Sequence, residues 1–412
     1  MGERCVVIGN GCAFAECVKA SRELGYSGEI CVVSNNSRPP YNPMLIINYA
    51  TGKIEHDALF PYGKGSEFYD RYDIVRFTDS PAISLDAENH IVKTADGLEL
   101  SYSKCVIATG ATPVLPAAFK NPGVPVYTLR TVEDGEKFKG LLESDKKRVL
   151  VAGASMVGVK VVEALVDTGF DVTLADQADF IFPQAACEKC AEIIQKIFEE
   201  KNVKLKFGRQ SEINNGEFDH IVVCTGVKPN ISFVDPAQVK TETGILVNSN
   251  METSAKDLYA AGDAAQGFDI FGGRHILGLW SSARLQGRIA GQNIAGKRVN
   301  AAGAVQHNIS RFFGNEFVSI GNIKNGDAFY EDIDTKNNRY LRLAFSGENL
   351  TGINILNISE ISGILKYRMT KSLLTDKDFN ESTSKSMAIH KLYEKYPGIE
   401  KAFVEYGKEV VK

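Results

Sequence analysis

The chain has 412 residues, of which 44% are hydrophobic and 24% charged, and its formal net charge is −4 at pH 7. This composition is that of an ordinary soluble globular protein, and the small net charge gives no indication of a nucleic-acid partner. No apolar run reaches the about 20 residues that a membrane-spanning helix needs. A chain of this length is expected to form two or three domains.

The N-terminus leads almost directly into a strand-like segment, residues 5–8, which argues against a signal peptide. Eight cysteines are scattered along the chain, several of them inside strand-like segments. We expect them to be small buried residues in a reducing compartment rather than a disulfide framework. The predicted location is therefore the cytoplasm.

The first strand runs into a glycine turn that contains Gly9 and Gly11. In a dinucleotide-binding turn the first glycine permits a tight bend, and the second lets a pyrophosphate approach the backbone at the start of a helix. The third position of this pattern normally holds glycine or alanine, but here it is Phe14. The next strand ends at Asn35 and Asn36, where an acidic residue would normally bind the ribose. A neutral hydrogen bond contributes about 1 kcal/mol and a charged one about 1.5–3, so we expect weaker binding of the adenosine.

A second glycine turn follows the predicted strand 149–152, with Gly153, Ser155 and Gly158 at the three key positions. The strand after it ends at Asp176, the acid expected roughly 20 residues on to bind a ribose 2′-hydroxyl. A 2′-phosphate would be repelled there by about 1 kcal/mol in water and about 4 at an intermediate dielectric. The turn therefore predicts NAD(H) rather than NADP(H). Two such turns in one chain are more specific than either alone.

Cys187 and Cys190 form a lone C-x-x-C pair at the start of a predicted helix. A zinc or iron–sulfur site needs further ligands, and none is evident nearby in the sequence. We therefore interpret the pair as the start of a helix, and we predict no metal site.

The segment 244–266 combines two short predicted strands with Gly262 and Asp263 at the end of the second. Taken alone, Asp263 could simply cap a helix, because aspartate is a preferred N-cap residue. The segment as a whole, however, resembles the M-x-T-S…I-Y-A-A-G-D signature of the FAD- and NAD-dependent pyridine-nucleotide oxidoreductases. In that family the signature aspartate, here Asp263, binds the ribityl and pyrophosphate region of the flavin. The helix that follows points its N-terminus at the flavin.

Other segments carry the same resemblance. Residues 38–53 are similar to a P-P-Y-x-x-x-L…G-K segment beside the flavin in rubredoxin reductases, NADH oxidases and the flavin domain of nitrite reductases. Residues 108–113 resemble A-T-G-A-x-P, and residues 224–230 resemble A-T-G-V-R-P-N. Trp280 is predicted to lie against the flavin ring, although a single tryptophan could equally belong to the core. The patterns and the resemblance together imply FAD contacts from Gly9, Gly11, Asn35, Asn36, Arg38, Ala108, Thr109, Gly110, Gly262, Asp263 and Trp280, and NAD contacts from Gly153, Ser155, Gly158, Asp176 and Gly226.

Three features depart from many relatives. No cysteine lies between Pro39 and Gly52, where several branches of the family carry a redox thiol. Pro43 stands where many relatives have arginine or lysine near the ring, and Lys160 where many have glutamate near the nicotinamide–flavin contact. The resemblance therefore implies that the flavin is the sole redox centre and that thiol chemistry is absent.

The predicted fold class is α/β, with two Rossmann-like dinucleotide-binding domains, one for FAD and one for NAD, and an α+β C-terminal interface domain. The predicted boundaries are 1–113 and 242–300 for the FAD domain, 114–241 for the NAD domain, and 301–412 for the interface domain. The region beyond residue 361 is predicted to be helical and charged.

The predicted function is FAD-dependent hydride exchange with NAD(H), in which the cofactors supply the chemistry and no catalytic side chain is assigned. The expected electron partner is an iron–sulfur protein or the iron–sulfur subunit of a larger dehydrogenase complex, so the chain is expected to be oligomeric or part of a hetero-complex. Two alternatives remain open. One is a structural subunit that binds FAD weakly or not at all, suggested by Phe14, the asparagine pair, Pro43 and Lys160. The other is a soluble NADH oxidase that uses oxygen.

Overall fold

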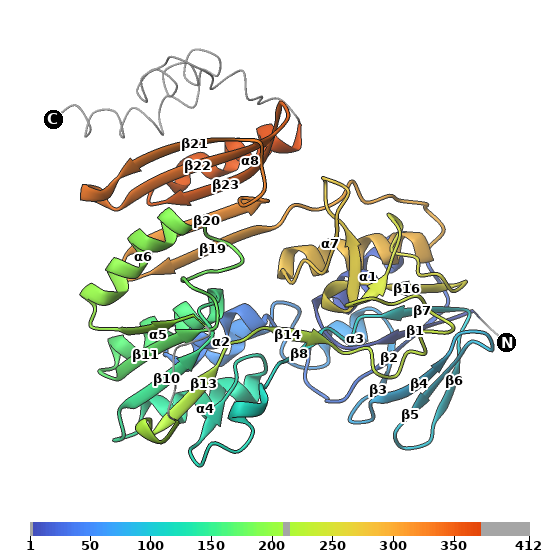
Figure 1. Cartoon of the computed structure of the whole chain (residues 1–412). Coiled ribbons are helices and arrows are strands. Elements are labelled where there is room, and N and C mark those ends of the chain that lie inside the picture. The colour runs from blue at the N-terminus through green and yellow to red at the C-terminus, as the bar shows by residue number, and fades with distance from the viewer. Residues whose placement is uncertain (1–2, 209–214, 372–412) are drawn as a thin grey trace. The chain divides into compact units, whose positions relative to one another are not determined.

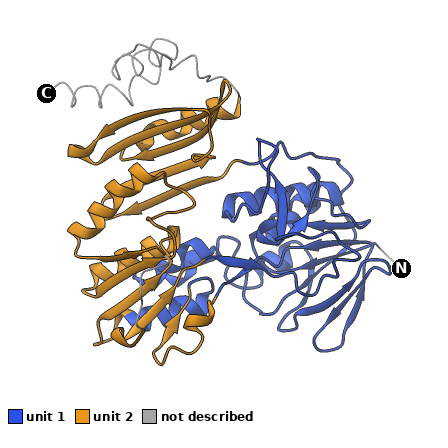
Figure 2. Ribbon diagram, viewed as in Figure 1, with its two compact units in different colours: residues 1–114, 129–141, 226–304 blue, residues 115–128, 142–225, 305–412 orange. Residues whose placement is uncertain are grey.

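The computed structural model describes residues 3–208 and 215–371, and the chain divides into two compact units (Figure 2). Unit 1 comprises residues 1–114, 129–141 and 226–304, and unit 2 comprises residues 115–128, 142–225 and 305–412. Across the described residues, no helix combines the length and apolar character that a membrane crossing requires. The three-domain boundaries expected from the sequence stay a prediction.

A parallel five-stranded sheet forms the centre of unit 1, in the order β16-β7-β1-β2-β3 (Figure 1). Its strands are β1 (Arg4–Ile8), β2 (Glu29–Val33), β3 (Ile74–Phe77), β7 (Lys104–Ile107) and β16 (Leu258–Ala260). The chain runs outward from β1 to β3 and then returns to the other side of β1, so Val6 pairs with Cys31 on one side and Cys105 on the other. In such sheets ligands bind beyond the carboxyl ends of the strands, where the strand order reverses. The first glycine turn follows β1 and therefore lies at this point.

Two helices of unit 1, α1 (Cys12–Glu23) and α7 (Trp280–Ile294), pack almost backbone to backbone. A Cβ atom on Gly287 would lie 2.1 Å from the carbonyl oxygen of Ala13, and one on Gly291 would lie 2.1 Å from that of Cys17. Real atoms do not approach so closely, so only glycine fits at these two positions of α7. The four-residue spacing of the two glycines places both on one face of the helix. Close contact with α1 fixes the first turn of α7 beside the first glycine turn.

The rest of unit 1 surrounds this sheet with short elements. An antiparallel three-stranded sheet joins β4 to β6, β8 pairs with β14, and β15, β17 and β18 form a further small sheet. These elements are α2 (Ile46–Ala50), α3 (Glu67–Arg71), α4 (Val132–Leu142), β4 (Ala82–Asp86), β5 (Ile91–Thr94), β6 (Glu99–Ser101), β8 (Ala111–Pro113), β14 (Val227–Pro229), β15 (Ile245–Leu246), β17 (Ala265–Phe268), β18 (Arg274–His275), η1 (Pro43–Leu45), η2 (His56–Leu59) and η5 (Gly262–Ala264).

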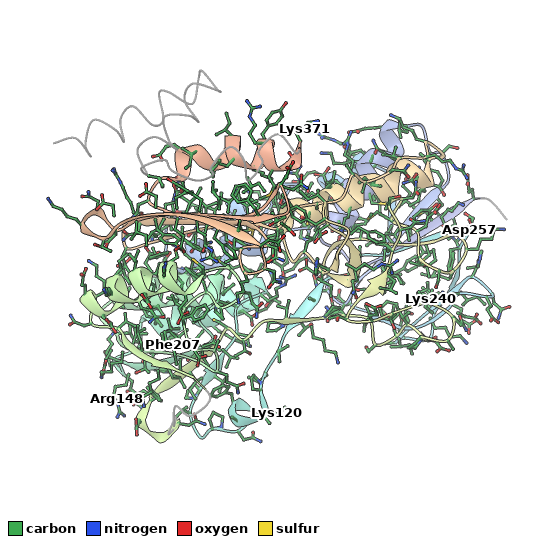
Figure 3. All side chains as sticks on the ribbon, turned by 45° about the horizontal axis from the view of Figure 1, so that its top comes forward. Lys120, Arg148, Phe207, Lys240, Asp257 and Lys371 are labelled. Carbon is green, nitrogen blue, oxygen red and sulfur yellow. The ribbon has the colours of Figure 1, made fainter. Side chains whose placement is uncertain are left out.

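Unit 2 repeats the central arrangement of unit 1. Its parallel sheet has the order β12-β11-β10-β13-β9, and the strand order again reverses beside the strand that leads into a glycine turn. The elements of this part are β9 (Val126–Tyr127), β10 (Arg148–Ala152), β11 (Asp171–Asp176), β12 (Lys204–Phe207), β13 (His220–Val223), α5 (Met156–Asp167), α6 (Glu188–Glu200), η3 (Ala117–Phe119) and η4 (Asn215–Glu217). Figure 3 labels Arg148, the first residue of β10, and Phe207, the last residue of β12. The predicted α/β class with two Rossmann-like sheets is confirmed.

The C-terminal part of unit 2 is an antiparallel sheet in the order β19-β20-β23-β22-β21 (Figure 1). It consists of β19 (His307–Phe312), β20 (Asn315–Gly321), β21 (Ala328–Asp334), β22 (Arg339–Ser346) and β23 (Asn349–Leu356), with η6 (Thr335–Asn337), η7 (Ser359–Ile361) and α8 (Ser362–Thr370). The Phe182 and Phe317 rings stack with their centroids 4.8 Å apart, and this contact joins the sheet to the segment before α6. The sequence of this region contains three strand-like segments, residues 317–320, 340–343 and 353–356, and they fall within β20, β22 and β23. Residues 372–412 of the predicted helical tail lie outside the described residues.

Buried polar contacts also join this sheet to α6. Asn354 is fully buried; its side chain accepts the Cys187 N–H at 2.9 Å and donates to the Ala185 carbonyl at 2.9 Å. Cys187 is the N-cap residue of α6, and Cys190 lies in the first turn. The C-x-x-C pair thus marks the start of a helix, as expected.

The close packing of α1 and α7 gives a first prediction. Gly287→Ala should lower the free energy of unfolding by about 1–3 kcal/mol or more, because its Cβ would overlap a backbone atom that cannot move aside. Gly140→Ala is the matched control, since no described atom lies within 4 Å of its Cβ position in α4. That control should stabilise by up to about 1 kcal/mol, because alanine favours helix more than glycine does. Urea unfolding measures both; equal effects of the two substitutions would contradict the backbone contact.

Glu331 gives a second prediction, on pH dependence. Its carboxylate accepts hydrogen bonds from Tyr340 at 2.6 Å and Arg342 at 2.8 Å, and it pairs with Lys189 of α6 at 2.6 Å. Burial raises the pKa of Glu331, but the hydrogen bonds from Lys189, Tyr340 and Arg342 outweigh it and lower that pKa to about 2. Its charge therefore stabilises the fold fully above the ordinary pKa of about 4.3, and this contribution is lost as pH falls towards 2.

Glu331→Gln should accordingly lower the free energy of unfolding at pH 7 by at most about 3 kcal/mol, and the difference from wild type should shrink below pH 4. Glu192→Gln, which removes an exposed carboxylate from the outer side of α6, serves as the control. Denaturant midpoints measured from pH 7 to pH 2.5 test the prediction. A wild-type advantage that stays constant over this range would contradict it.

Candidate functional site

The turn after β1 has the backbone geometry of an anion cradle. Gly9 has a φ of +108°, and a Cβ atom there would lie 2.2 Å from the carbonyl oxygen of Ala108. Gly11 is the N-cap residue of α1, and no atom of the described residues lies within 4 Å of its Cβ position. Among the described residues, no side chain forms a capping hydrogen bond at the N-terminus of α1. The backbone N–H groups at the start of α1 and the positive end of the helix dipole can therefore receive a phosphate.

Phe14 does not occupy this cradle. Its side chain is fully buried and packs against α3, with its ring centroid 5.9 Å from that of Phe68 and 6.3 Å from that of Tyr69. The bulky residue thus fills a core between α1 and α3. Phe14 stands at the position that normally holds glycine or alanine, and its ring is accommodated by packing against the aromatic side chains of α3. The space beside Gly11 stays open.

Asp263 lies inside η5, directly after the end of β16. It is buried, and its carboxylate pairs with the Arg130 guanidinium at 2.5 Å. Ala261, rather than Asp263, is the N-cap residue of η5. The adjacent Gly262 has a φ of +78° and donates its N–H to Gln286 Oε1 of α7 at 2.8 Å. The Asp263–Arg130 pair therefore lies at the same edge of the parallel sheet as the glycine turn after β1. Sequence analysis missed Arg130, which belongs to no recognisable motif, and Gln286.

Trp280 is the first residue of α7 and is half-buried. Its indole Nε1 is fully buried and has no hydrogen-bond partner among the residues that the structure describes. Leaving a buried donor unpaired costs about 1–3 kcal/mol, so such a donor is suited to an acceptor on a ligand. The N-terminus of α7 also has no side-chain cap from the described residues. Both features fit a cofactor at this end of the helix.

The asparagine pair after β2 organises its own turn. Asn36 accepts the Arg38 N–H at 3.1 Å through Oδ1, and its Nδ2 donates to Asn35 Oδ1 at 2.9 Å. The guanidinium of Arg38 pairs with Glu133 of α4. Asn10, inside the first glycine turn, donates to the Arg38 carbonyl at 2.7 Å and so connects the two segments. Sequence analysis did not single out Asn10, although it lies inside the glycine pattern.

Ala108, Thr109 and Gly110 follow the end of β7. The Thr109 hydroxyl donates to the Asn230 carbonyl at 2.7 Å, and the Asn230 side chain donates to the Thr109 carbonyl at 3.0 Å. Gly110 accepts the Asn230 N–H at 3.0 Å through its carbonyl. The two segments that resembled family motifs, around residues 109 and 230, are therefore held together beside the first turn.

The second glycine turn, in unit 2, repeats the geometry of the first. Gly153 has a φ of +110°, and its Cβ would lie 2.4 Å from the carbonyl oxygen of Cys224. A Cβ on Gly158 would lie 1.9 Å from the Gly153 carbonyl oxygen, so the third glycine is sterically required here. Ser155 caps α5 by accepting the Gly158 N–H at 3.3 Å, and it donates to the Cys224 carbonyl at 2.9 Å.

Asp176 lies at the end of β11 against this turn. Its Oδ2 accepts the Ala154 N–H at 2.8 Å and its Oδ1 accepts the Ala178 N–H at 2.9 Å. Two backbone donors therefore hold the carboxylate in a fixed orientation next to Gly153. Gly226, which follows β13, has a φ of +103° and accepts the Val114 N–H at 2.9 Å. The assignment of these residues to NAD stays a prediction.

Lys160, which replaces a common glutamate, has a structural partner in unit 2. Its ammonium donates to the Arg311 carbonyl of β19 at 2.7 Å and pairs with Glu163 one turn later on α5. Glu163 also accepts the Phe313 N–H at 2.8 Å. The lysine therefore fastens α5 to the C-terminal sheet. Pro43 is the first residue of η1 in unit 1.

All eight cysteines are free and buried. Burial raises the pKa of every one of these thiols, to about 12 for Cys12, Cys17, Cys31 and Cys224. A thiol with such a pKa is almost entirely protonated at neutral pH, and the thiolate is the reactive form. In the described part of the chain, no three metal-ligating side chains gather closely enough to hold an ion.

The chain is similar to known proteins over most of its length. A family model described as pyridine nucleotide-disulphide oxidoreductase matches residues 3–287. The chain is 30% identical over 370 residues to "NADH-dependent phenylglyoxylate dehydrogenase subunit epsilon" of Aromatoleum evansii, an alignment that covers 84% of this chain and 87% of the relative. It is 24% identical over 393 residues to "NADH-rubredoxin oxidoreductase" of Clostridium acetobutylicum, which covers 94% and 98% of the two chains.

A solved structure shows the same fold. The covalent putidaredoxin reductase–putidaredoxin complex contains a chain that matches with a TM-score of 0.84 at 20% identity, over 94% of this chain and 98% of that one.

The burial of the thiols gives a third prediction. At pH 7.5 the folded protein should react with a maleimide at none of its eight cysteines within minutes, because all eight are buried and burial raises the pKa of each thiol. For Cys12, Cys17, Cys31 and Cys224, a pKa of about 12 leaves roughly one thiol in 10⁴–10⁵ ionised. In 6 M guanidinium chloride all eight should react. Intact mass measures the number of labels; rapid labelling of Cys12 or Cys187 in the folded protein would contradict the structure.

Proposed function

Because the chain belongs to the pyridine nucleotide-disulphide oxidoreductase family and is an FAD-dependent NADH oxidoreductase, we propose that it exchanges electrons with an iron–sulfur protein or with the iron–sulfur subunit of a larger dehydrogenase. The resemblance to this family is confirmed by the family model, which matches residues 3–287. The observation that carries the proposal is the state of the cysteines: all eight are free and buried, so none of them forms a disulfide that could accept electrons from a flavin.

The described residues fit both cofactors. In unit 1 we assign the pyrophosphate of FAD to the open turn at Gly11, and its ribityl region to the Asp263–Arg130 pair. In unit 2 we assign the adenosine ribose of NAD to Asp176 beside the turn at Gly153. A bound flavin would supply the redox chemistry, since it accepts a hydride from a nicotinamide and can release electrons singly. In this proposal the protein binds and orients the two cofactors, and no catalytic side chain is assigned.

The names of the relatives support the choice of partner. One relative is named as a subunit of an NADH-dependent dehydrogenase and another as an oxidoreductase of NADH and rubredoxin. The first name combines NADH with a dehydrogenase of more than one subunit, and the second combines NADH with rubredoxin. By analogy we propose that this chain works within a hetero-complex or with a separate iron–sulfur carrier. Eight free thiols support a reducing compartment such as the cytoplasm.

An anaerobic titration tests the proposal. NADH should bleach the visible flavin band of the purified protein, whereas NADPH should do so far more slowly. A rubredoxin or a ferredoxin, added as an oxidised probe, should then restore the band faster than air does. A colourless protein that added FAD cannot restore would favour a structural subunit. Rapid aerobic turnover of NADH without any partner would favour an oxidase; either result would overturn the proposal.

Asp176 gives a prediction on coenzyme choice. Asp176→Ala should reduce kcat/KM for NADH about 10- to 100-fold, because a charged hydrogen bond contributes about 1.5–3 kcal/mol. It should also improve the ratio of NADPH to NADH activity, since repulsion of a 2′-phosphate is removed. Asp179→Ala removes an exposed carboxylate three residues away and is the control. Steady-state kinetics with both coenzymes provide the measurement. Unchanged coenzyme preference in the Asp176 variant would exclude its role.

A further inference from the structure

Trp280 and Arg284 form a stacked pair at the start of α7. Trp280 is the single tryptophan of the chain. The guanidinium carbon of Arg284 lies 4.7 Å from the centre of the indole ring, which is the range of a cation–π contact. The spacing of four residues places both side chains on one face of the helix. The arginine therefore covers one side of the indole at the end of α7 that fits a cofactor.

Arg284 is itself held by a buried carboxylate on another helix. Its Nε and Nη2 donate to the same oxygen of Glu16 on α1, at 2.9 and 2.7 Å. The Tyr62 hydroxyl donates to that oxygen as well, at 2.9 Å. The side chain of Glu16 is only 4% exposed, whereas that of Arg284 is 43% exposed. The buried end of the contact is therefore the carboxylate, and the guanidinium reaches inward to meet it.

The surroundings of Glu16 leave it little freedom. A buried carboxylate that loses its partner strongly destabilises the fold. Breaking the contact between Glu16 and Arg284 therefore carries a large free-energy cost. Lys19 lies 4.0 Å from the second carboxylate oxygen and adds positive charge. The glycine contacts also bring α1 and α7 close together, so Glu16 and Arg284 face each other across a short distance. The position of the guanidinium is thus determined by α1, not by its own helix alone.

We propose that Arg284 is a positioning residue of the flavin site: clamped by Glu16, it fixes the plane of the Trp280 indole and leaves the buried indole N–H available to the cofactor. This inference rests on the proposed function only in placing the flavin at Trp280. The coupling between the arginine and the indole is a property of the protein itself.

A second ion pair between the same two helices provides the comparison. Arg288, one turn further along α7, pairs with Glu23 of α1 at 3.1 Å, and both side chains are almost half exposed. Exposed pairs of this kind contribute little to stability. Arg288 makes no cation–π contact with Trp280 among the described residues. The two arginines share a helix, a charge and a partner helix, and they differ in contact with the indole.

The single tryptophan makes the contact measurable. In the purified full-length protein with its flavin, Arg284→Met should shift tryptophan emission to longer wavelength and lower the time-resolved anisotropy of the indole. The methionine side chain cannot form the cation–π contact and is not held by Glu16, so the ring gains freedom and exposure to water. Arg288→Met should leave both signals at their wild-type values. Unchanged emission and anisotropy in Arg284→Met would overturn the proposal. The same comparison of the two variants on protein without flavin gives the same readout, so the test remains decisive if the proposed function fails.

A second measurement asks whether the effect reaches the flavin through Trp280. The rate of FAD release, followed as the rise of flavin fluorescence after dilution, should increase several-fold in Arg284→Met and not in Arg288→Met. In a Trp280→Phe background the Arg284 substitution should add a much smaller increase. Equal increases with and without the tryptophan would show that Arg284 acts on the fold alone and would contradict its positioning role.

Loss of Arg284 leaves Glu16 without its main partner, so a variant that does not fold is anticipated. The double variant Glu16→Gln/Arg284→Met removes the buried charge together with the cation and restores a foldable core. It should show the same change in tryptophan anisotropy as the single variant. Wild-type anisotropy in a folded double variant, judged by circular dichroism, would overturn the proposal.

Discussion

The structure depends on two places where the backbone of one strand end touches the backbone of a neighbouring one. At Gly9 and at Gly153 a Cβ atom would lie 2.2 and 2.4 Å from a carbonyl oxygen of the adjacent strand end. No side chain fits, and both residues have φ values near +110°, which only glycine adopts without strain. This single constraint brings a helix N-terminus to the point of strand-order reversal in each sheet. Every polar contact assigned to a cofactor is arranged around it.

The two units use the same helical position for different purposes. Glu16 stands seven residues after Gly9, and Lys160 stands seven residues after Gly153. Glu16 binds Arg284 of α7, and Lys160 binds the Arg311 carbonyl of β19. In each case a charged side chain on the helix after the glycine turn, α1 or α5, binds the element packed against that helix, α7 or β19. The departure of Lys160 from the family pattern therefore has a structural explanation within unit 2, which sequence comparison by motif alone does not provide.

Sequence patterns predicted the local features of this chain well. The two glycine turns, the strand that ends at Asp176 and the signature around Asp263 are contiguous patterns, and they led to the fold class and the family. Phe14 raised doubt because the pattern could not show where its ring goes. The structure places that ring against Phe68, more than fifty residues away in sequence, so the doubt is removed by a contact that no local pattern contains.

The contacts that complete the site were not predictable in this way. Arg130 and Asp263 are separated by 133 residues, and Arg284 and Glu16 by 268. Neither arginine belongs to a recognisable motif, and each is placed by the packing of distant elements. Gln286, which accepts the Gly262 N–H, is likewise an ordinary helix residue until α7 is seen against η5. Long-range pairing, and not residue type, makes these side chains part of the site.

The burial of all eight thiols also limits how many reducing equivalents one chain can store. A flavoprotein with an additional redox disulfide can hold four electrons, two on sulfur and two on its flavin. Under the proposed function the flavin is the single store of electrons, so it would be full after one hydride. Each reduced flavin would then have to pass on its electrons before it could accept a hydride from the next coenzyme.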